Sequence, residues 1–275
     1  MSAETFQAPV DAEARIPGQA GELDEPVAEV KGYTPPEQEP DVVAVAGFKG
    51  GVGKSRTAKE LAFLRQAVLT DFEWDWGGVT RGWGYFEEDR VSTPPLLRAF
   101  QTGETPKPLS GNGRKPDLIP GHTDFERNQP KADVVAESLQ QWSRGLKRRL
   151  VVDTHPGGCE STYGAMAGAR VTVVPAVLGN EELRALEGLL TNLPDYPLLL
   201  IPYKVSRAPA AWLLDELERL SDTFQAQIGP AVGNYSWIPD RRSRVPICAG
   251  KPSKRTGQFI EEMQAVAEAV ENYGR

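Results

Sequence analysis

The chain has 275 residues, 40% hydrophobic and 25% charged, which is typical of a soluble globular protein long enough for one large domain. No run approaches about 18 apolar residues, and the start of the chain lacks a basic segment followed by an apolar one, so we expect neither a membrane span nor a secretory signal. Two cysteines, Cys159 and Cys248, are too few for a disulfide framework and fit a reducing cytosol. These features predict a cytoplasmic protein.

The first 40 residues differ in composition from the rest. Residues 1–41 carry ten acidic and two basic residues, a net charge of −8, whereas the remainder holds 29 basic and 28 acidic residues. Residues 1–40 also contain six prolines and no sustained periodicity. Such a segment buries too little apolar surface to offset its ordering entropy, so we predict a disordered acidic tail at 1–40 and a folded domain at 41–275. The tail is either a partner-binding segment or a solubilising linker.

From residue 41 onward, apolar runs alternate with amphipathic stretches. A short apolar run at 42–46 ends in a glycine-rich turn, and further buried strands are predicted at 67–71, 149–153, 171–175 and 198–202. Helices are predicted at about 55–65, 181–190, 210–221 and 257–272, and we assign no elements within 74–148. This alternation indicates a doubly wound α/β domain whose mostly parallel sheet is covered on both faces.

A glycine-rich loop follows the first predicted strand, with the sequence Lys49-Gly50-Gly51-Val52-Gly53-Lys54-Ser55. Backbone amides around its glycines can converge on an anion, and the next helix adds its positive N-terminal dipole. Lys54 would reach the β- and γ-phosphates of a nucleotide, and the Ser55 hydroxyl would ligate Mg²⁺. The loop resembles the deviant Walker A motif, K-G-G-x-G-K-[S/T], of the ParA/MinD family. We therefore favour a phosphate-binding loop over a chance glycine-rich turn.

The resemblance extends along nearly the whole chain after residue 41. The segment Asp71-Phe72-Glu73-Trp74-Asp75 occupies the place of the family's D-x-D-P-Q motif, and Asp153-Thr154-His155-Pro156-Gly157 that of its D-T-P-P-G motif. Residues 171–175 are similar to its V-x-x-P strand, and Ile238-Pro239 with Gly250-Lys251-Pro252 to its late I-P…G-K-P segment. The order of these motifs implies a P-loop NTPase fold of the deviant Walker A type.

The resemblance also implies roles for particular residues. Lys49 would cross to the partner subunit's phosphates in an ATP-sandwiched homodimer. Asp71 and Asp153 would hold Mg²⁺ through water, although a strand-end carboxylate such as Asp153 can also cap a turn. Glu73 stands where the family has an aspartate that orients the attacking water, so its extra methylene would slow hydrolysis. Together with Lys54, the residues Lys49, Glu73 and Asp153 form the expected catalytic set, and Ser55, Asp71 and Asp153 the expected metal site.

Contacts to the nucleotide are expected from the loop and from two later segments. In the family, an asparagine commonly reads adenine at the end of the strand 198–202, where this chain has Tyr203-Lys204. Tyr203 either stacks on the base or is a half-buried aromatic residue. The full expected set is Lys49, Gly50, Gly51, Val52, Gly53, Lys54, Ser55, Arg56, Tyr203, Lys204, Pro239 and Asp240.

Two further groups of residues have no assigned role. His155 replaces a family proline and is either a structural turn residue or a catalytic one. The tryptophans Trp74, Trp76 and Trp83 either line a partner surface or pack back on the domain.

A basic segment near the C-terminus is a candidate DNA contact. Residues 239–257 carry one acid, Asp240, and six bases: Arg241, Arg242, Arg244, Lys251, Lys254 and Arg255. This cluster could grip DNA phosphates without reading bases, or it could be a solvated face or contact the nucleotide. ParA-like proteins bind DNA nonspecifically as ATP dimers. The resemblance therefore implies nonspecific DNA and a ParB-like centromere-binding protein as partners, with a nucleoid-associated location.

The last predicted helix argues against a membrane role. Phe259, Met263, Val266, Val270 and Tyr273 recur at spacings of 4, 3, 4 and 3 and form one apolar stripe. Its exposed positions are mostly glutamates, whereas a helix that lies on a membrane needs basic residues to meet anionic lipid. We expect this helix to pack on the core.

Three functions are compatible with these features. The first is a slowly hydrolysing partition ATPase that segregates a plasmid or chromosome, and the second is a nucleotide-gated positioning or regulatory protein that binds no DNA. The third is a biosynthetic ligase such as the cobyrinate diamide synthases. A ligase of that kind needs a glutamine-hydrolysing domain with its own Cys–His pair, and no residues remain to build one.

Overall fold

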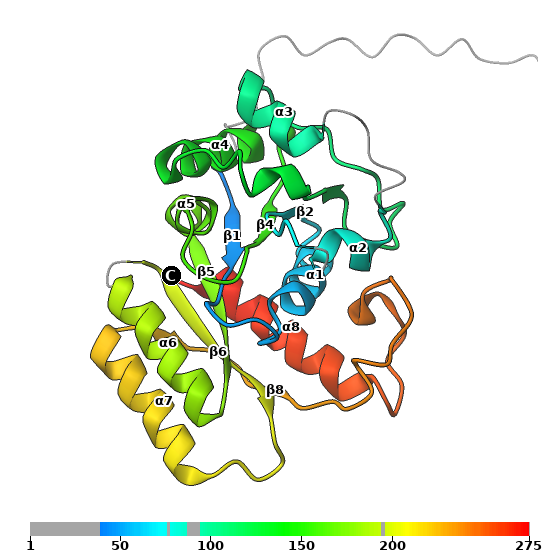
Figure 1. The fold of residues 1–275 in the computed structure, drawn as a ribbon. Helices are drawn as coiled ribbons and strands as arrows, with labels where there is room; N and C mark the ends of the chain where they lie inside the picture. The colour runs from blue at the N-terminus through cyan, green and yellow to red at the C-terminus, as the bar shows by residue number, and fades with distance from the viewer. Residues whose placement is uncertain (1–38, 76–77, 87–93, 194–195, 275) are drawn as a thin grey trace, which may run out of the picture. The chain divides into compact units, whose positions relative to one another are not determined.

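The computed structural model describes residues 39–75, 78–86, 94–193 and 196–274. Its elements are arranged around one parallel sheet. Among these residues the strand order is β3-β2-β4-β1-β5-β6-β7, and β8 pairs with β6 (Figure 1). All seven strand pairings are parallel. The strands are β1 Val42–Val45, β2 Val68–Asp71, β3 Leu118–Ile119, β4 Leu150–Asp153, β5 Val171–Val177, β6 Leu198–Val205, β7 Gln227–Ile228 and β8 Val232–Gly233. This order confirms the predicted doubly wound α/β class.

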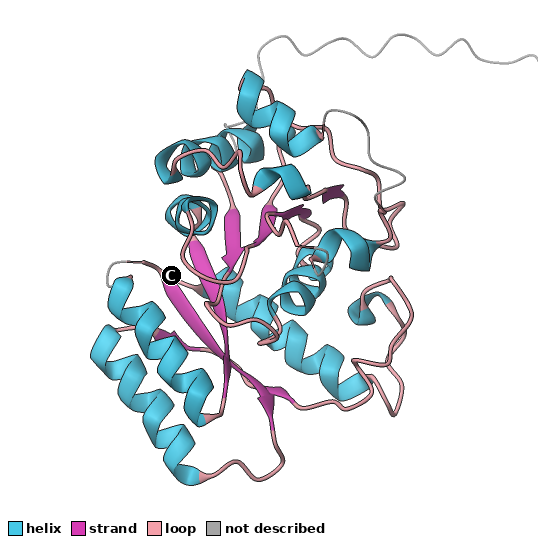
Figure 2. Ribbon diagram, viewed as in Figure 1, coloured by secondary structure: helices cyan, strands magenta, loops and turns pink. Residues whose placement is uncertain are grey.

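Helices cover both faces of the sheet (Figure 2). On one face lie α3 Pro95–Thr102, α4 Ala132–Leu146, α5 Glu160–Gly168, α6 Asn180–Asn192 and α7 Ala211–Phe224. On the other lie α1 Lys54–Leu64, α2 Val79–Trp83 and α8 Gly257–Asn272. Two short 3₁₀ turns, η2 Thr123–Phe125 and η3 Ile247–Ala249, complete the described elements.

The central strand β1 separates two apolar cores. Val42 and Ala44 pack into one core, and Val43 and Val45 pack into the other. All four side chains are at most 1% exposed, because successive residues of a strand point to opposite faces and both faces are covered. The continuous apolar run predicted from the sequence is the expected pattern for such a strand.

The five predicted strands and four predicted helices are confirmed, with their ends shifted by a few residues. The strands β5 and β6 continue to Val177 and Val205. In α8, the predicted apolar stripe from Phe259 to Val270 is fully buried, which confirms that this helix packs on the core. None of the helices among the described residues has the length and apolar character required to cross a membrane.

Among the described residues of 74–148, where no element was assigned, lie five structured elements: α2, α3, β3, η2 and α4. In α4, the side chains of Val135, Leu139 and Trp142 recur at helical spacing and are buried. This periodicity could have identified the helix, but glycine, proline and tryptophan in the surrounding sequence obscured it.

The helix α5 was also missed, because Gly164 and Gly168 are unfavourable for an isolated helix. Both glycines lie against α4. A Cβ at Gly164 would come within 2.5 Å of the Ala132 carbonyl oxygen, and one at Gly168 within 2.9 Å of the Ala136 Cα. The glycines therefore allow close packing of the two helices, which a local helix propensity cannot indicate.

The described residues belong to a compact unit that comprises residues 37–275. The predicted acidic tail at 1–40 lies, up to residue 38, outside the described residues. Trp76, one of the three tryptophans considered above, lies outside them as well.

Candidate nucleotide-binding site

The glycine-rich loop leaves the carboxyl end of β1 and enters α1 at Lys54. Gly51 and Gly53 have φ angles of 77° and 111°, a backbone conformation that side chains with a Cβ rarely adopt. A Cβ at Gly53 would also lie 2.4 Å from the ring of Tyr203. The loop conformation therefore requires glycine, and the N-terminus of α1 directly follows it, as in anion-binding loops.

Lys54 is the first residue of α1 and is only 6% exposed. Burial lowers the pKa of its ammonium group, and the negative charges of Asp153 and Glu73 oppose this shift. These interactions place the lysine beside the two predicted carboxylates. A lysine buried at a helix N-terminus is suited to receive an anionic ligand.

Asp71 and Asp153 end the adjacent strands β2 and β4, and they are direct partners in the parallel register. Both side chains are fully buried. Burial raises the pKa of Asp71 to about 6, although hydrogen bonds from Thr80 and Glu73 oppose the shift. The backbone amide of Glu73 donates to Asp71 Oδ1 at 3.0 Å, and that of Thr80 to Oδ2 at 2.7 Å. The start of α2 thus holds Asp71 in place.

Asp153 has a different environment. Neither of its buried carboxylate oxygens has a well-formed hydrogen bond within the described structure. Burial and the neighbouring Asp71 raise the pKa of Asp153 well above its ordinary value, and the Ser55 hydroxyl and Lys54 act against this rise. A buried carboxyl group without hydrogen bonds is costly unless a ligand satisfies it. Hard oxygen donors from Ser55, Asp71 and Asp153 fit Mg²⁺, so these residues could hold it.

Glu73 lies beside this pair and contacts His155. Its Oε1 is 2.5 Å from His155 Nδ1 and accepts the Asp75 backbone amide at 3.3 Å. The imidazole stacks on Trp74, with ring centroids 3.6 Å apart and planes 10° from parallel. Of the two readings of His155, a structural turn residue or a catalytic one, this contact leaves the second open.

Lys49 lies at the start of the loop and points to α6. Its Nζ is 2.6 Å from Glu182 Oε1 and 3.3 Å from Glu181 Oε2. The hydrogen bond that Lys49 donates to Glu182 is the main cause that raises the pKa of Lys49. Neither glutamate was singled out from the sequence, because 133 residues separate Lys49 from Glu182.

Tyr203 and Lys204 lie at the carboxyl end of β6, next to the loop. The Tyr203 side chain is buried against Gly53, with 4% of the residue exposed, and burial raises its pKa to about 12. Lys204 Nζ donates to the Gly51 carbonyl oxygen at 2.7 Å. Tyr203 therefore packs against the loop and supports it. A pocket of about 320 Å³ begins two residues later, at Val205. Its lining includes Arg207, Asn234, Tyr235 and Glu262.

The remaining predicted nucleotide contacts are dispersed. Arg56 lies on α1 and pairs with buried Glu60 at 3.6 Å. Pro239 and Asp240 are exposed and lie at the start of the basic segment. None of the three lines the pocket next to β6.

The basic segment 239–257 runs past α1 and α2 (orange in Figure 1). Glu60, which is fully buried on α1, accepts the backbone amides of Ile247 and Cys248 at 2.9 Å each. Arg241 points into its own loop and donates to the carbonyl oxygens of Ser243 and Val245. The other five predicted DNA-contacting bases are exposed: Arg242, Arg244, Lys251, Lys254 and Arg255.

The two described tryptophans of the earlier group pack on the domain. Trp74 stacks on His155, and Trp83 is 9% exposed and donates from Nε1 to the Pro116 carbonyl oxygen at 2.7 Å. Nζ of Lys115 lies over the Trp83 ring, 3.5 Å from its centroid. For these two residues, packing is the reading that the structure supports.

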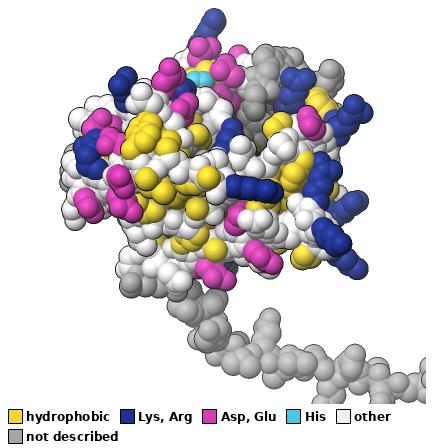
Figure 3. Space-filling model, turned by 90° about the horizontal axis from the view of Figure 1, so that it is seen from below, with side chains coloured by type: hydrophobic (Ala, Val, Ile, Leu, Met, Phe, Trp, Pro, Cys, Tyr) yellow, Lys and Arg dark blue, Asp and Glu magenta, His cyan; other side chains and the backbone are white. Residues whose placement is uncertain are grey.

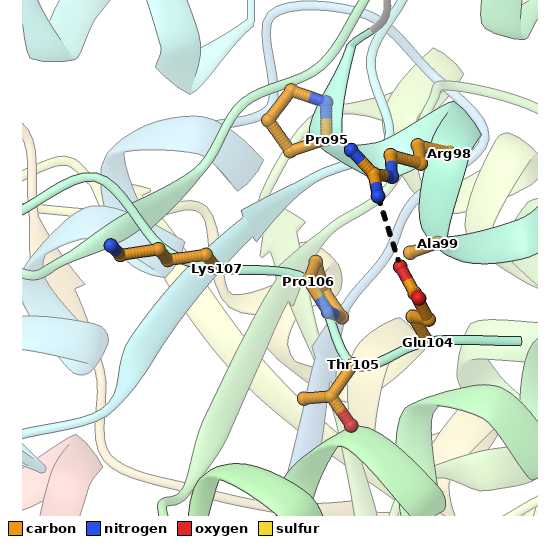
Figure 4. Close-up of a pocket in the computed structure, with 7 residues that line it drawn as sticks. All are labelled: Pro95, Arg98, Ala99, Glu104, Thr105, Pro106 and Lys107. Carbon is orange, nitrogen blue, oxygen red and sulfur yellow. Dashed lines mark hydrogen bonds and ion pairs between the residues drawn. The ribbon is translucent and has the colours of Figure 1, made fainter. Parts of the chain in front are cut away.

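A larger pocket, of about 390 Å³, lies beside α3 (Figure 4). An ion pair between Arg98 and Glu104, 3.4 Å long, spans part of it. It shares no residue with the glycine-rich loop or with the strand-end carboxylates. We therefore assign it no part in phosphate binding.

Comparisons with known proteins locate the fold. No protein-family model and no curated protein sequence matches the chain. Solved structures do match it: a McdA variant from Cyanothece in complex with ATP aligns with a TM-score of 0.69 at 15% identity, over 86% of this chain and 98% of that one. The septum site-determining protein MinD from Pyrococcus horikoshii, complexed with Mg-ADP, aligns at 0.65 with 14% identity, over 85% and 96%.

A plasmid partition protein from Borrelia burgdorferi aligns with a TM-score of 0.58 at 16% identity, over 84% of this chain and 97% of that one. At such identities the likeness concerns the fold. It agrees with the predicted resemblance, since the glycine-rich loop and the two strand-end carboxylates occur in the chain order expected from the motifs. The chain therefore has the fold of the ParA/MinD-type P-loop ATPases.

Proposed function

We propose that this protein is a Mg²⁺-dependent ATPase that partitions or positions a cargo. The observation that carries the proposal is the convergence of three features at one end of the sheet: the glycine-rich loop, buried Lys54, and the buried Asp153 carboxylate, which has no well-formed hydrogen bond. Positive charge and loop amides would bind the phosphates. Ser55, Asp71 and Asp153 would hold Mg²⁺, which when bound neutralises phosphate charge.

The reaction is hydrolysis of ATP. The oxygen of a water molecule bonds to the γ-phosphorus, the bond from that phosphorus to the bridging oxygen breaks, and its electron pair leaves with ADP. One water proton is transferred to the phosphate product. Glu73 would orient the water, and Lys54 would stabilise negative charge on the phosphates. The adenine base of ATP would lie in the pocket that begins at Val205, directly after Lys204 in the chain.

Lys54→Ala tests the nucleotide site. We expect ATP·Mg²⁺ affinity to fall by at least about a hundredfold, because charge-assisted contacts to phosphate are lost, while the fold is kept. Lys107→Ala removes an exposed lysine from the pocket beside α3 and should leave affinity unchanged. Titration calorimetry measures both. Equal affinities in the two variants would overturn the assignment of the loop.

We further propose that nonspecific DNA is a partner, bound by an ATP-dependent homodimer whose hydrolysis a ParB-like protein stimulates. The exposed lysine and arginine residues of the basic segment 239–257 support this. Arg244 also packs over Gly84, while Lys115 Nζ donates to the carbonyl oxygen of the preceding residue, Trp83. Arg244 and Lys115 thus both lie at the end of α2, and Figure 3 shows Lys and Arg side chains gathered along that side of the molecule.

Removing Arg242 and Arg244 together tests the DNA proposal. Because phosphate contacts release counterions, we expect affinity for nonspecific duplex DNA to fall and the dependence of log K on log salt to flatten by about 0.9 per lost contact. The matched variant Lys107→Ala with Arg127→Ala removes two exposed positive charges elsewhere. Fluorescence anisotropy with ATP present measures both. Absence of DNA binding by the unmutated protein would favour a positioning function without DNA.

A further inference from the structure

The contact between Glu73 and His155 joins two segments that are 82 residues apart in the chain. Glu73 follows β2, and His155 follows β4, directly beyond the strand-end carboxylates Asp71 and Asp153. Their side chains are 10% and 17% exposed, so the 2.5 Å contact is largely shielded from solvent. Shielding strengthens a hydrogen bond between a carboxylate and an imidazole relative to one in water.

The imidazole is itself held in place. It lies nearly parallel to the Trp74 ring, at a centroid distance of 3.6 Å, and Trp74 in turn meets Phe125 edge-on at 6.4 Å. Phe125 is fully buried and packs on Phe72 in the core. The position of His155 is thereby connected to the core through two aromatic contacts.

The hydrogen-bond partner of His155, Glu73, determines which ring nitrogen carries the proton. When the carboxylate of Glu73 is ionised it can only accept hydrogen bonds, so the contact then requires a proton on Nδ1 of His155, which donates the hydrogen bond. The other histidine of the chain has the opposite arrangement, because Nδ1 of His122 accepts the backbone amide of Asp124 at 3.1 Å. The two imidazoles therefore differ in the protonation of Nδ1.

We infer that His155 is a positioning residue that fixes the carboxylate of Glu73 for water attack, an inference that rests on the proposed ATPase function. A glutamate has one more rotatable bond than an aspartate, so its carboxylate samples more positions unless a neighbour restrains it. The hydrogen bond from His155 supplies this restraint. Since misplacement of a reacting group by about 1 Å can cost on the order of a hundredfold in rate, the restraint matters for turnover.

Kinetics of two His155 variants test the inference. We expect His155→Ala to lower kcat by about 10- to 100-fold while the ATP dissociation constant changes less than about twofold, because the loop and Lys54 bind the phosphates. His155→Asn can place an amide N–H donor close to where Nδ1 lies and should recover most of the activity. In a Glu73→Gln background, His155→Ala should have no further effect, since the two residues act as one unit.

Two results would overturn the inference while leaving the ATPase proposal intact: a normal kcat in His155→Ala, or His155→Asn as impaired as His155→Ala. His122→Ala is the control and should hydrolyse ATP normally. If the unmutated protein binds ATP without hydrolysing it, the proposed ATPase function fails, and the positioning role fails with it.

Nitrogen-15 NMR of histidine-labelled protein examines the pair without any nucleotide. At alkaline pH we expect a protonated Nδ1 for His155 and an unprotonated Nδ1 for His122, and Glu73→Gln should shift the His155 signals selectively. Because Asp75 lies within 4.8 Å of both members of the pair, the three side chains also form a possible transition-metal donor set. A His155 signal that changes on adding a chelator would assign Nδ1 to a metal and overturn the inference.

Discussion

Charged side chains are buried around the candidate site, and most have a visible compensation. Glu60 receives two backbone amides, Asp71 receives two others, and Lys54 lies near Asp153 and Glu73. Lys59, which is 6% exposed on α1, is less well compensated: Glu60 stabilises its charge, but Arg56, Arg241 and Lys115 act against it. Burial, the largest cause, lowers the pKa of Lys59 to about 8.

Replacing Lys59 by methionine should stabilise the protein at neutral pH. The folded pKa of Lys59 is about 8 and the unfolded value is about 10.5, so between these values the unfolded chain binds more protons and stability rises with pH. Below pH 8 the destabilisation caused by burying the charged lysine is present in full, at most about 3 kcal/mol. We expect Lys59→Met to raise the free energy of unfolding at pH 7 by about 1–3 kcal/mol.

That gain should shrink towards pH 10, where the lysine is neutral in the folded protein. Urea denaturation of both proteins at pH 7 and pH 10 measures the difference. A gain of equal size at both pH values would mean that packing of the methionine side chain, and not the lysine charge, is responsible.

The contact between α4 and α5 shows how a helix with low intrinsic helix propensity becomes part of the core. In α5, Gly164 faces the first turn of α4, where a Cβ would lie 2.5 Å from both the Ala132 carbonyl oxygen and the Val135 Cβ. In α6, by contrast, Gly188 is exposed and a Cβ there would meet nothing within 4 Å. Glycine therefore has a packing role at one position and none at the other.

Alanine substitutions at these two glycines should have opposite effects. Gly188→Ala should stabilise the protein by about 0.5–1 kcal/mol, because alanine loses less backbone entropy on folding. Gly164→Ala should destabilise it by about 1–3 kcal/mol, because α4 and α5 must move apart. Chemical denaturation measures both. Stabilisation by Gly164→Ala would show that the helices tolerate a wider separation.

At the scale of the whole molecule, α1 connects the candidate phosphate loop with the basic segment. Its first residue, Lys54, directly follows the glycine-rich loop. Six residues further along, Glu60 holds the backbone at Ile247 and Cys248 next to the exposed basic residues. On the other side of the loop, Lys49 is paired with Glu181 and Glu182 on α6. A lysine held within its own subunit must leave these glutamates before it can reach a partner subunit.

Lys49→Ala tests the proposed dimer. We expect it to bind ATP with nearly unchanged affinity but to form less ATP-dependent dimer, because its proposed contact is with the other subunit's phosphates. Glu182→Gln weakens the hold on Lys49 within the subunit and should preserve or increase the dimer. Light scattering with ATP measures both. An unaffected dimer in Lys49→Ala would contradict a role across the interface.

Local patterns in the sequence predicted much of this molecule. The continuous apolar strands, the glycine-rich loop and the carboxylates that end β2 and β4 lie where expected, because strand burial and loop chemistry depend on neighbouring residues. The stripe of apolar residues in α8 likewise predicted its packing on the core. Helix α4 follows the same local rule, although the residues around it concealed it.

Other features depended on tertiary structure. The pairs Glu73–His155, Lys49–Glu182 and Glu60–Ile247 join residues 82, 133 and 187 positions apart, and no local pattern specifies such partners. Tertiary structure likewise determines that Arg241 turns into its own loop while Arg242 is exposed, and that the glycines of α5 allow close helix packing. The sequence by itself determined the fold and the glycine-rich loop, whereas the partners of the charged side chains were decided by which segments the folded sheet brings together.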